Sequence, residues 1–439
     1  MAMVNPCLSD HSNGTQEYDV ESIRRSEYPL LQGPDVYLDH TGTTLFPKSA
    51  LDDFVQDVTS NLYGNPHSES KSSRRSTTKI EDIRKEALQF FNADPKDFDL
   101  VFVQNATAAI KLVVEILQSD SGARGGFWYG YHADSHTSLV GVREVAGAGF
   151  SYFASDAEVE DWITTGNVSR GQSSVVQGSR LFAYPAALAA TSELDLSNVD
   201  EAPDFVALSF YKIFGFPDLG ALLVRRALSP MLQRRKYFGG GTVEMVVNDV
   251  VWQSTNAGEP HEYLEDGTLP FHNIIALGHA LNTHRRLYTS QKLVSRHTAR
   301  LARYMYDEMS ALQHWDGSPI CVIYKEPDVE YGNTTSAGST IAFNLRYIDG
   351  TWVNLSDVEL KANKYSIHLR TGGVCNPGGI AGSLKLSSWE LMRNYVAGVE
   401  CGHGPAILGG KPSGIVRALV PGEPRRVPVA HVSSRTYMG

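Results

Sequence analysis

Short apolar runs of strand length alternate with helical patterns along this chain, and that alternation limits its fold more than any other feature. The clearest example is Leu100-Val101-Phe102-Val103, which a polar turn follows at 104–107 and a helical stretch at 108–117. Apolar runs this short are typical of strands that are covered on both faces. A strand, a turn and a helix in succession predict an α/β domain around a buried sheet.

Later segments repeat this pattern. Residues 205–208 and 220–224 are further apolar runs of strand length. From about residue 290 a helical pattern near 295–313 precedes the strand-like run 340–345. The order of these segments predicts a large α/β domain followed by a smaller α+β domain.

The domain limits follow from the same pass along the chain. Residues 1–27 are polar and show no period, so we expect a mobile N-terminal tail there. The large domain is expected at 28–285 and the small C-terminal domain at 286–439. Within the latter, the segment 419–439 is rich in Pro, Arg and Val and has no helical period.

Composition limits the partners of the protein. The 439 residues carry a formal charge of -10, with a sequence pI near 5.8, which argues against a nucleic acid or an anionic membrane. Cys7, Cys321, Cys375 and Cys401 are widely spaced, so we expect neither a disulfide framework nor a metal site. No apolar run approaches the ~20 residues of a membrane span, and the N-terminus lacks the blocks of a signal peptide. We expect a cytoplasmic protein.

A single lysine lies among aromatic and aliphatic residues in Ser209-Phe210-Tyr211-Lys212-Ile213-Phe214-Gly215, directly after the predicted strand at 205–208. Burial favours the neutral amine, which is the nucleophile that forms a Schiff base. The alternative is a lysine at a strand end whose ammonium reaches water. This segment alone favours the second interpretation.

The turn at 104–107 has two interpretations as well. Backbone N–H groups at the start of the following helix point in the direction where an anion can bind. Most such turns in α/β proteins bind nothing, so the turn alone does not predict a phosphate site.

Six motifs, taken together and in their order, are more informative than any one of them. They are Asp39-His40-Thr41-Gly42-Thr43-Thr44, Asn105-Ala106-Thr107, Asp134-Ser135-His136-Thr137-Ser138, Ser209-Phe210-Tyr211-Lys212, Glu265-Asp266-Gly267-Thr268 and Leu369-Arg370-Thr371-Gly372. This series resembles the class V aminotransferase and cysteine desulfurase superfamily, whose enzymes use pyridoxal 5′-phosphate (PLP). The closest subgroup is the molybdenum cofactor sulfurases, and the resemblance runs from about residue 28 to 418. It implies fold type I of the PLP-dependent transferases, an α/β fold whose large domain has a mixed, mostly parallel sheet of about seven strands.

The resemblance implies that the large domain binds PLP. Lys212 would hold the cofactor covalently and later move protons. Ala106 and Thr107 would bind the cofactor phosphate at the start of a helix, and the Ser209 hydroxyl would add a bond.

Other roles implied by the resemblance concern the ring, the substrate and a second subunit. His136 would stack on the pyridine ring, and its alternative is to cap a helix. Thr268 would reach the phosphate of a neighbouring subunit, which implies a homodimer. Arg370 would bind the α-carboxylate of a small amino acid through two parallel hydrogen bonds, and its alternative is a surface arginine. The loop Gly239–Gly241 lies near the substrate or is an ordinary turn.

The sequence departs from the family in three places. Molybdenum cofactor sulfurases have Arg-Thr-Gly-Cys-x-Cys-Asn-Pro-Gly-Ala-Cys, and of these cysteines only Cys375 is present here. Roughly twenty residues are missing near Tyr184, which falls where the family has the aspartate that pairs with the pyridinium nitrogen. Asp195 lies in a different motif and is no substitute. The end of the chain, 419–439, does not resemble the family's last helix, and we interpret these breaks as mis-spliced exon ends in a gene model.

The predicted function is a PLP-dependent lyase or transferase that acts at Cβ of a small amino acid. The depleted cysteine motif, and the lack of room for the C-terminal domain of full-length eukaryotic sulfurases, favour an enzyme similar to the cysteine-desulfurase-like PLP enzyme of fungal ustiloxin biosynthesis, a mycotoxin and secondary-metabolite pathway. Aspartate would lose its β-carboxylate, and the product would attack an aldehyde co-substrate to form a C–C bond. The alternative enzyme is a cysteine desulfurase or molybdenum cofactor sulfurase that carries sulfur on Cys375. The alternative of another class is a non-catalytic partner protein with the PLP fold.

Overall fold

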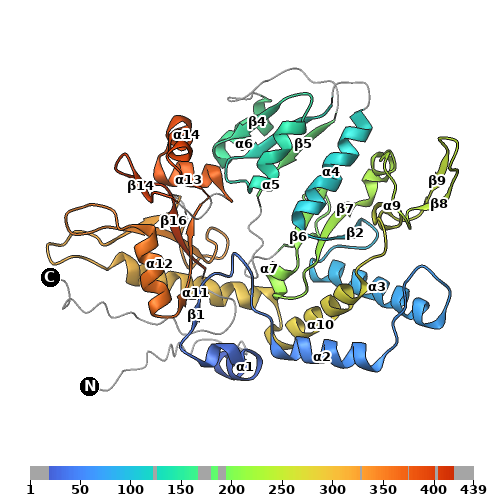
Figure 1. Cartoon of the computed structure of the whole chain (residues 1–439), viewed down its shortest axis with the longest axis horizontal. Helices are drawn as coiled ribbons and strands as arrows, with labels where there is room; N and C mark the ends of the chain where they lie inside the picture. Colours follow the sequence, from blue (N-terminus) through green and yellow to red (C-terminus); the bar gives the residue numbers. More distant parts are fainter. Residues whose placement is uncertain are drawn as a thin grey trace.

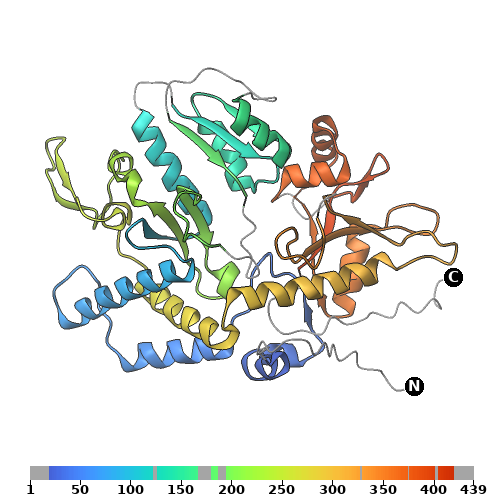
Figure 2. The same cartoon turned by 180° about the vertical axis from the view of Figure 1, so that it is seen from behind.

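The structure is a computed structural model that describes residues 19–121, 126–166, 179–185, 194–326, 329–373, 375–400 and 404–419. Helices and strands alternate along the chain, as predicted, and form a large α/β part beside a smaller α+β part (Figure 1 and Figure 2). The predicted fold class is therefore confirmed.

The described chain begins with a helix where a mobile tail was predicted. α1 (Val20–Glu27) is capped by Asp19, whose carboxylate accepts the backbone N–H of its first turn at 3.1 Å. Glu27 is buried and accepts the backbone N–H of Ser49 at 3.0 Å. A capped helix with a buried contact to the rest of the fold is not a tail, so that prediction is wrong from Val20 onward. Residues 1–18 lie outside the described part.

A three-stranded sheet forms the centre of the large part. β2 (Phe98–Val103) and β6 (Phe205–Ser209) both pair antiparallel with β7 (Gly220–Arg225), which lies between them. Every residue of β2 and β7 except the last is buried. The strands therefore show no polar face, as expected for a sheet that is covered on both sides.

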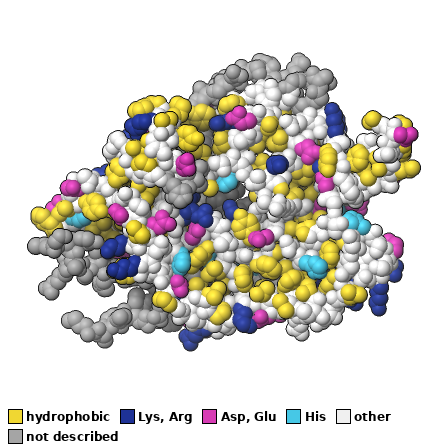
Figure 3. All heavy atoms as spheres, in the orientation of Figure 1, with side chains coloured by type: hydrophobic (Ala, Val, Ile, Leu, Met, Phe, Trp, Pro, Cys, Tyr) yellow, Lys and Arg dark blue, Asp and Glu magenta, His cyan; other side chains and the backbone are white. Residues whose placement is uncertain are grey.

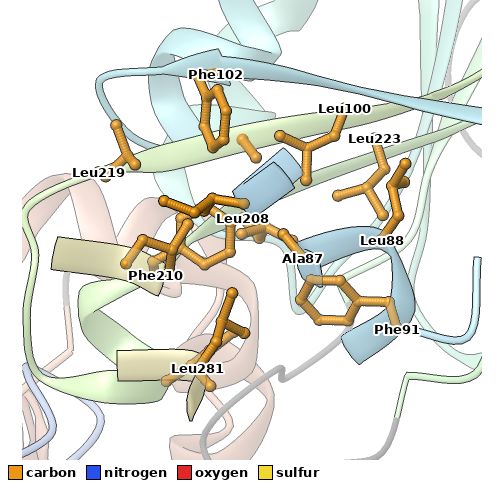
Figure 4. Packing of buried hydrophobic residues seen from close by; sticks show 14 of the residues in the cluster. Ala87, Leu88, Phe91, Leu100, Phe102, Leu208, Phe210, Leu219, Leu223 and Leu281 are labelled. Atoms are coloured by element: carbon orange, nitrogen blue, oxygen red, sulfur yellow. The ribbon is translucent and has the colours of Figure 1, made fainter. Parts of the chain in front are cut away.

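Helices cover the two faces of this sheet. Leu100 packs with α3 (Lys71–Phe90) and α10 (Phe271–Tyr288), whereas its neighbour Val101 packs with α4 (Ala106–Ser121) on the other face. Figure 4 shows part of the first cluster, with Ala87, Leu88, Phe91, Leu100, Phe102, Leu208, Phe210, Leu219, Leu223 and Leu281 in contact. Burial of this apolar surface, at about 25 cal/mol per Å², is the main term that stabilises the large part.

A second sheet of the large part is entirely parallel. β3 (Trp128–His132) lies between β4 (Phe150–Phe153) and β5 (Arg180–Ala183), and α6 (Asp156–Thr165) packs against it. No strand of the described residues joins β5 to β6. Where one sheet of about seven strands was predicted, the described residues of the large part form two sheets of three strands, and residues 186–193, between β5 and β6, lie outside the described part.

The smaller part begins at α11 (Gln291–Ser310), which leaves the end of α10 through Thr289 and Ser290. Its antiparallel sheet has the order β10 (Cys321–Tyr324), β11 (Thr340–Leu345), β16 (Ile415–Leu419) and β13 (Arg370–Gly372). The helices that accompany this sheet are α12 (Leu355–Lys364), α13 (Pro377–Leu384) and α14 (Ser388–Val396).

One strand from near the N-terminus belongs to the smaller part. β1 (Val36–Tyr37) pairs parallel with β12 (Ile367–His368). The next residue, Leu38, donates to the carbonyl of His368 at 2.7 Å and accepts from the backbone N–H of Leu419 at 2.9 Å. β1 therefore pairs with the smaller part, although the predicted large domain, 28–285, includes its residues. Of the segment 419–439, only Leu419 is described.

One longer helix and several short elements complete the described chain. The longer helix is α2 (Lys48–Ser60). The short helices are η1 (Pro29–Gln32), α5 (Thr137–Val140), η3 (Gly141–Val145), α7 (Tyr211–Phe214), η4 (Arg226–Leu228), α8 (Ser229–Leu232) and α9 (Pro260–Leu264). The strands are β8 (Val243–Val246), β9 (Gln253–Thr255), β14 (Ile407–Leu408) and β15 (Lys411–Pro412). None of the helices within the described ranges has the length and apolar character needed to cross a membrane.

A buried ion pair closes the edge of β2. Arg84 of α3 donates to Glu265 at 2.7 and 3.0 Å, and Glu265 also accepts the backbone N–H of Phe102 at 2.6 Å. The two charged side chains are only 4% and 6% exposed. Glu265 thus supplies the acceptor that an edge strand lacks, and it fixes the start of the loop that carries Thr268.

Replacing Glu265 with alanine should lower the free energy of unfolding by about 3–5 kcal/mol, because Arg84 stays buried without its partner. The double variant Arg84→Met/Glu265→Leu should cost less, since it leaves no buried charge. The control is Asp52→Ala, which breaks the exposed pair with Lys48, whose side chains are both 56% exposed. That change should alter stability by about 1 kcal/mol or less. Urea denaturation compares the variants, and equal costs at Glu265 and Asp52 would contradict the argument.

Candidate active site

The backbone of Lys212 is fixed by the turn that follows β6. Lys212 lies on the four-residue helix α7, at the centre of Figure 1, and its carbonyl accepts the hydroxyl of Thr44 at 2.7 Å. Gly215 ends this helix with φ +77, and a Cβ there would lie 2.6 Å from the backbone of Leu45. Only glycine allows this close approach, which brings the segment around Thr44 onto the turn.

The amine of Lys212 is poorly hydrated. Its neighbours Phe210, Ile213 and Phe214 are buried, and Lys212 itself is half-buried. Burial is the largest influence on its amine and lowers the pKa; the positive charge of Arg370 lowers it further, while a thiolate at Cys375 raises it. These influences favour the neutral amine and place Lys212, Arg370 and Cys375 within electrostatic range of each other.

Ser209 connects the lysine strand to the start of α4. Its hydroxyl oxygen accepts the backbone N–H of Ala106 at 2.9 Å, and Asn105 caps the same turn by accepting from Ala108 at 3.0 Å. Gly220 leaves the necessary space, since a Cβ there would lie 2.4 Å from Cα of Asn105. The predicted phosphate residues Ala106 and Ser209 are therefore adjacent, at a helix start that favours an anion.

His136 caps α5, which was its alternative role. Its Nδ1 accepts the backbone N–H of Ser138 at 3.1 Å. The hydroxyl of Ser138 in turn lies 2.9 Å from that of Thr107 on α4. Partial burial and then the charge of Lys212 lower the pKa of His136, so the ring lies near the lysine as well. Capping fixes the ring position, and stacking on a cofactor ring stays a prediction.

Arg370 is held by a carboxylate and is not a free surface side chain. Its Nη2 and Nε contact one oxygen of Asp39 at 2.9 and 3.3 Å. Gly42 leaves the space, because a Cβ there would lie 2.1 Å from the guanidinium. Among the described residues, no acceptor binds Nη1. No role was predicted for Asp39, although it begins one of the six motifs, and its acidic side chain was the available signal.

Cys375 lies on the loop between β13 and α13. Its carbonyl accepts the backbone N–H of Thr137 at 3.0 Å, and its side chain is half-buried. The first turn of α13, which follows this loop, packs closely at Gly378, where a Cβ would lie 2.1 Å from the carbonyl oxygen of Ala133. The smaller part therefore contributes Cys375 and Arg370 to a site whose lysine comes from the large part.

Tyr184 does not take over the function of an aspartate. Its hydroxyl donates to Asp156 at 2.7 Å, and burial followed by this bond raises its pKa to about 12. The phenol is therefore neutral near pH 7. Asp195 is exposed, and its carboxylate accepts the backbone N–H of Ser197 at 3.0 Å. This local bond is what we expect of a residue that belongs to another motif.

Thr268 belongs to an exposed loop. Its hydroxyl accepts from the Asn65 amide at 3.5 Å, and no hydrogen bond within the described ranges joins it to Lys212, Ser209 or Ala106. The neighbouring Gly267 donates to the carbonyl of Gly240 at 2.6 Å, so the loop Gly239–Gly241 rests on this loop. Neither observation tests the predicted role of Thr268 in a second subunit.

The surface agrees with a site between the two parts. Figure 3 shows Lys, Arg and His side chains at the rim of a hollow near the centre of the face seen in Figure 1. Over the described ranges, no three His, Cys, Asp or Glu side chains are grouped to hold a metal ion. A lysine with a lowered pKa, a helix start and a paired arginine thus come from both parts of an α/β fold and face one site.

The family follows from the sequence match. The model of the aminotransferase class-V family matches residues 36–149 and 186–388. The chain belongs to this family, whose enzymes use PLP, so the predicted resemblance is confirmed. The unmatched stretch between these ranges holds β4, α6, β5 and Tyr184, the place where the family pattern was predicted to break.

Relatives of known function are molybdenum cofactor sulfurases. The chain is 48% identical over 442 residues to that of Aspergillus niger, 46% over 446 residues to that of Aspergillus fumigatus, and 48% over 432 residues to that of Chaetomium globosum. These matches cover 93%, 93% and 91% of this chain, but 53%, 52% and 54% of the relatives. The chain thus spans about half the length of the curated relatives it matches.

Solved structures share the fold. The cysteine desulfurase of Thermococcus onnurineus NA1 has a TM-score of 0.66 at 19% identity, over 93% of this chain and 94% of that chain. The cysteine desulfurase CsdA of Escherichia coli has a TM-score of 0.65 at 21% identity, over 93% and 95%. A C-DES variant with glycine covalently linked to its PLP cofactor has a TM-score of 0.61 at 14% identity, over 92% and 96%. At these identities the likeness establishes the fold alone.

Two substitutions should move the pKa of Lys212 in opposite directions. Arg370→Gln removes a positive charge and should raise it; Cys375→Ser removes a thiolate and should lower it. Carbon-13 NMR of reductively methylated lysines in the PLP-free protein measures this pKa, with the Lys212 signal assigned by its loss in Lys212→Arg. A shift of the same sign in both variants would contradict the placement of these groups.

Proposed function

We propose that this chain is a PLP-dependent, cysteine desulfurase-like enzyme that takes sulfur from cysteine onto Cys375. The observation that carries this proposal is the meeting of three groups from two parts of the fold. Arg370 and Cys375, both from the smaller part, act on the pKa of Lys212 from the large part. The names of the relatives, which are molybdenum cofactor sulfurases, support sulfur chemistry.

The described residues fit PLP at two of its ends. The phosphate would bind at the N-terminal turn of α4 and at Ser209. The backbone N–H groups and the hydroxyl there are hydrogen-bond donors, and the helix start favours a negative charge. The poorly hydrated amine of Lys212 would bind the aldehyde carbon. PLP, when bound, draws electron density from the substrate Cα. Tyr184, which falls at the aspartate's place in the sequence, donates to Asp156 and so supplies no carboxylate for the ring nitrogen.

Arg370 and Lys212 have separate tasks in this proposal. Arg370 would bind the substrate α-carboxylate through Nη1, which Asp39 leaves open while it orients the rest of the guanidinium. The lowered pKa of Lys212 keeps its amine able to accept a proton from the substrate Cα and to return one to the product.

Cys375 would carry the sulfur. Its thiolate attacks the substrate sulfur; the new S–S bond forms as the Cβ–S bond of the substrate breaks. The substrate carbon gains a proton and leaves as alanine. The net change is cysteine plus the Cys375 thiol giving alanine plus a Cys375 persulfide, which balances without an added oxidant or reductant.

Decarboxylation of aspartate would use the same Arg370 and Lys212 and leave Cys375 idle. The curated relatives are molybdenum cofactor sulfurases, so they favour the sulfur reaction over this earlier prediction. Aspartate therefore enters the experiments below as the competing substrate. The non-catalytic alternative predicts that neither amino acid reacts.

We also propose that the chain acts as a homodimer. Thr268 has its described contact with Asn65 on an exposed loop, and the buried pair Arg84–Glu265 holds the start of that loop. An ordered, exposed hydroxyl is suited to reach the phosphate site of a second copy. Sedimentation of the wild type with PLP present measures the number of copies. Comparison with Thr268→Ala under the same conditions tests whether Thr268 contributes to the dimer.

Lys212→Ala should remove the visible absorption band that wild-type protein shows with PLP, because no other side chain replaces its amine. The control Lys236→Ala changes an exposed lysine and should keep the band. Addition of cysteine or aspartate should shift the band only for the amino acid that the site accepts. A colourless wild type that takes up no PLP would refute the proposed function.

Cys375→Ala should reduce sulfide release from cysteine with dithiothreitol by roughly 10³-fold, because the sulfur acceptor is lost. Cys321→Ala, a control at the other described cysteine, should stay within about twofold of wild type. Alanine and sulfide are measured together by mass spectrometry and methylene blue. If Cys375→Ala kept full activity, or if carbon dioxide from aspartate were the main product, the sulfur assignment would be wrong.

A further inference from the structure

A histidine with no role in the family pattern lies behind the active-site loop. His132 ends β3, is 7% exposed, and points its Nδ1 at the backbone N–H of Asp134, 3.2 Å away. Its Nε2 lies 3.5 Å from Oδ1 of Asp156. Since Nδ1 accepts a hydrogen bond, the proton of the neutral ring belongs on Nε2, facing the carboxylate.

Asp156 receives a second donor on the same oxygen. The hydroxyl of Tyr184 donates to it at 2.7 Å, and the Tyr184 ring lies 5.3 Å from the His132 ring, centre to centre. Asp156 is also the first residue of α6, where the helix dipole favours its negative charge. The carboxylate therefore holds both aromatic side chains in place at the end of the parallel sheet.

The loop that His132 begins is the one that contacts the rest of the site. Ala133 packs against Gly378, and Asp134 lies beside Gly379, where a Cβ would be 2.8 Å from its carboxylate. Thr137 donates to the carbonyl of Cys375 at 3.0 Å. His136 lies between these contacts, near Lys212. A change in this loop would reach the lysine and the cysteine together.

We propose that His132 is a positioning residue, which with Asp156 and Tyr184 fixes residues 133–137 against the Cys375 loop. Asp156 and Tyr184 lie in the stretch between 149 and 186 that the family model does not match. The inference deepens the proposed function, on which its activity readout rests. Hydrogen exchange provides a readout that does not depend on PLP or on any reaction.

Three substitutions separate the contacts of His132. His132→Phe keeps an aromatic ring and removes the hydrogen bond from Asp134 and the contact with Asp156. His132→Asn places an oxygen where Nδ1 was, so it can accept from Asp134 but cannot reach Asp156. Tyr184→Phe removes one donor from Asp156 at a side chain that is 53% exposed, so it should not prevent folding. The matched control is His314→Phe, which removes a bond of 3.0 Å to the carbonyl of Arg346 in the smaller part.

Amide exchange of the peptide that spans 133–138, followed by mass spectrometry on the full chain, is measured first. His132→Phe should exchange roughly tenfold faster there, and His132→Asn should lie between this variant and wild type, because it keeps the contact with Asp134 and loses the one with Asp156. With cysteine as substrate, kcat of His132→Phe should fall about tenfold while KM changes less than about twofold, because Arg370 lies on another strand. Tyr184→Phe should lie between wild type and His132→Phe.

Exchange in 133–138 that is unchanged in both His132→Phe and Tyr184→Phe would overturn the proposal. So would an equal effect of His314→Phe, or faster exchange along the whole chain, since either would show only a loss of stability. If His132→Phe failed to fold, His132→Asn compared with Tyr184→Phe would still decide the question through the same peptide. A wild type without desulfurase activity would refute the proposed function and leave the exchange experiment intact.

Discussion

The partial burial of Lys212 depends on how the large part packs around α7. The amine follows a strand whose neighbours are covered on both faces, and Phe210, Ile213 and Phe214 around it are buried. A charged ammonium in such surroundings loses hydration, which is why burial is the largest influence on its pKa. The central sheet and its helices therefore provide more than stability: they lower the pKa of the residue to which the proposed function assigns the proton transfers.

One short segment connects this amine to the smaller part. Its strand β1 pairs with β12, its Asp39 binds Arg370, and its Thr44 binds the carbonyl of Lys212. These three contacts lie within nine residues, so the segment cannot shift at one of them without affecting the others. The distance between the arginine and the lysine, two residues that are far apart in the chain, is thus controlled by local geometry.

The sequence predicted the parts of this arrangement that depend on residue type. A lysine in an apolar segment and the motif around Arg370 can be read without a structure, because few residues replace an amine or a guanidinium. It did not predict contacts made across long separations, such as Asp39 with Arg370, 331 positions apart. The helix α1 was missed because its polar sequence looks like a tail, and its stability comes from the buried contact of Glu27 with Ser49.

The division of the sheet was only partly foreseeable. The sequence indicates that residues are missing near Tyr184, but it does not show that β5 then loses its connection to β6. His132 could not be found either, since a histidine at the end of an apolar run is most often an ordinary core residue. Its meaning depends on Asp156 and Tyr184, which only the fold brings beside it.

The absence of the family's aspartate at Tyr184 would shift the demands of catalysis onto other residues. A carboxylate at the ring nitrogen of PLP stabilises a positive charge there, whereas the phenol of Tyr184, with a pKa of about 12, is neutral and donates to Asp156. Less electron withdrawal leaves more of the work to groups that act directly on the substrate. Desulfuration suits this situation because the thiolate of Cys375 supplies a strong nucleophile for the bond that breaks. The single cysteine that the motif retains is the one that lies within electrostatic range of Lys212, which is the position this reasoning requires.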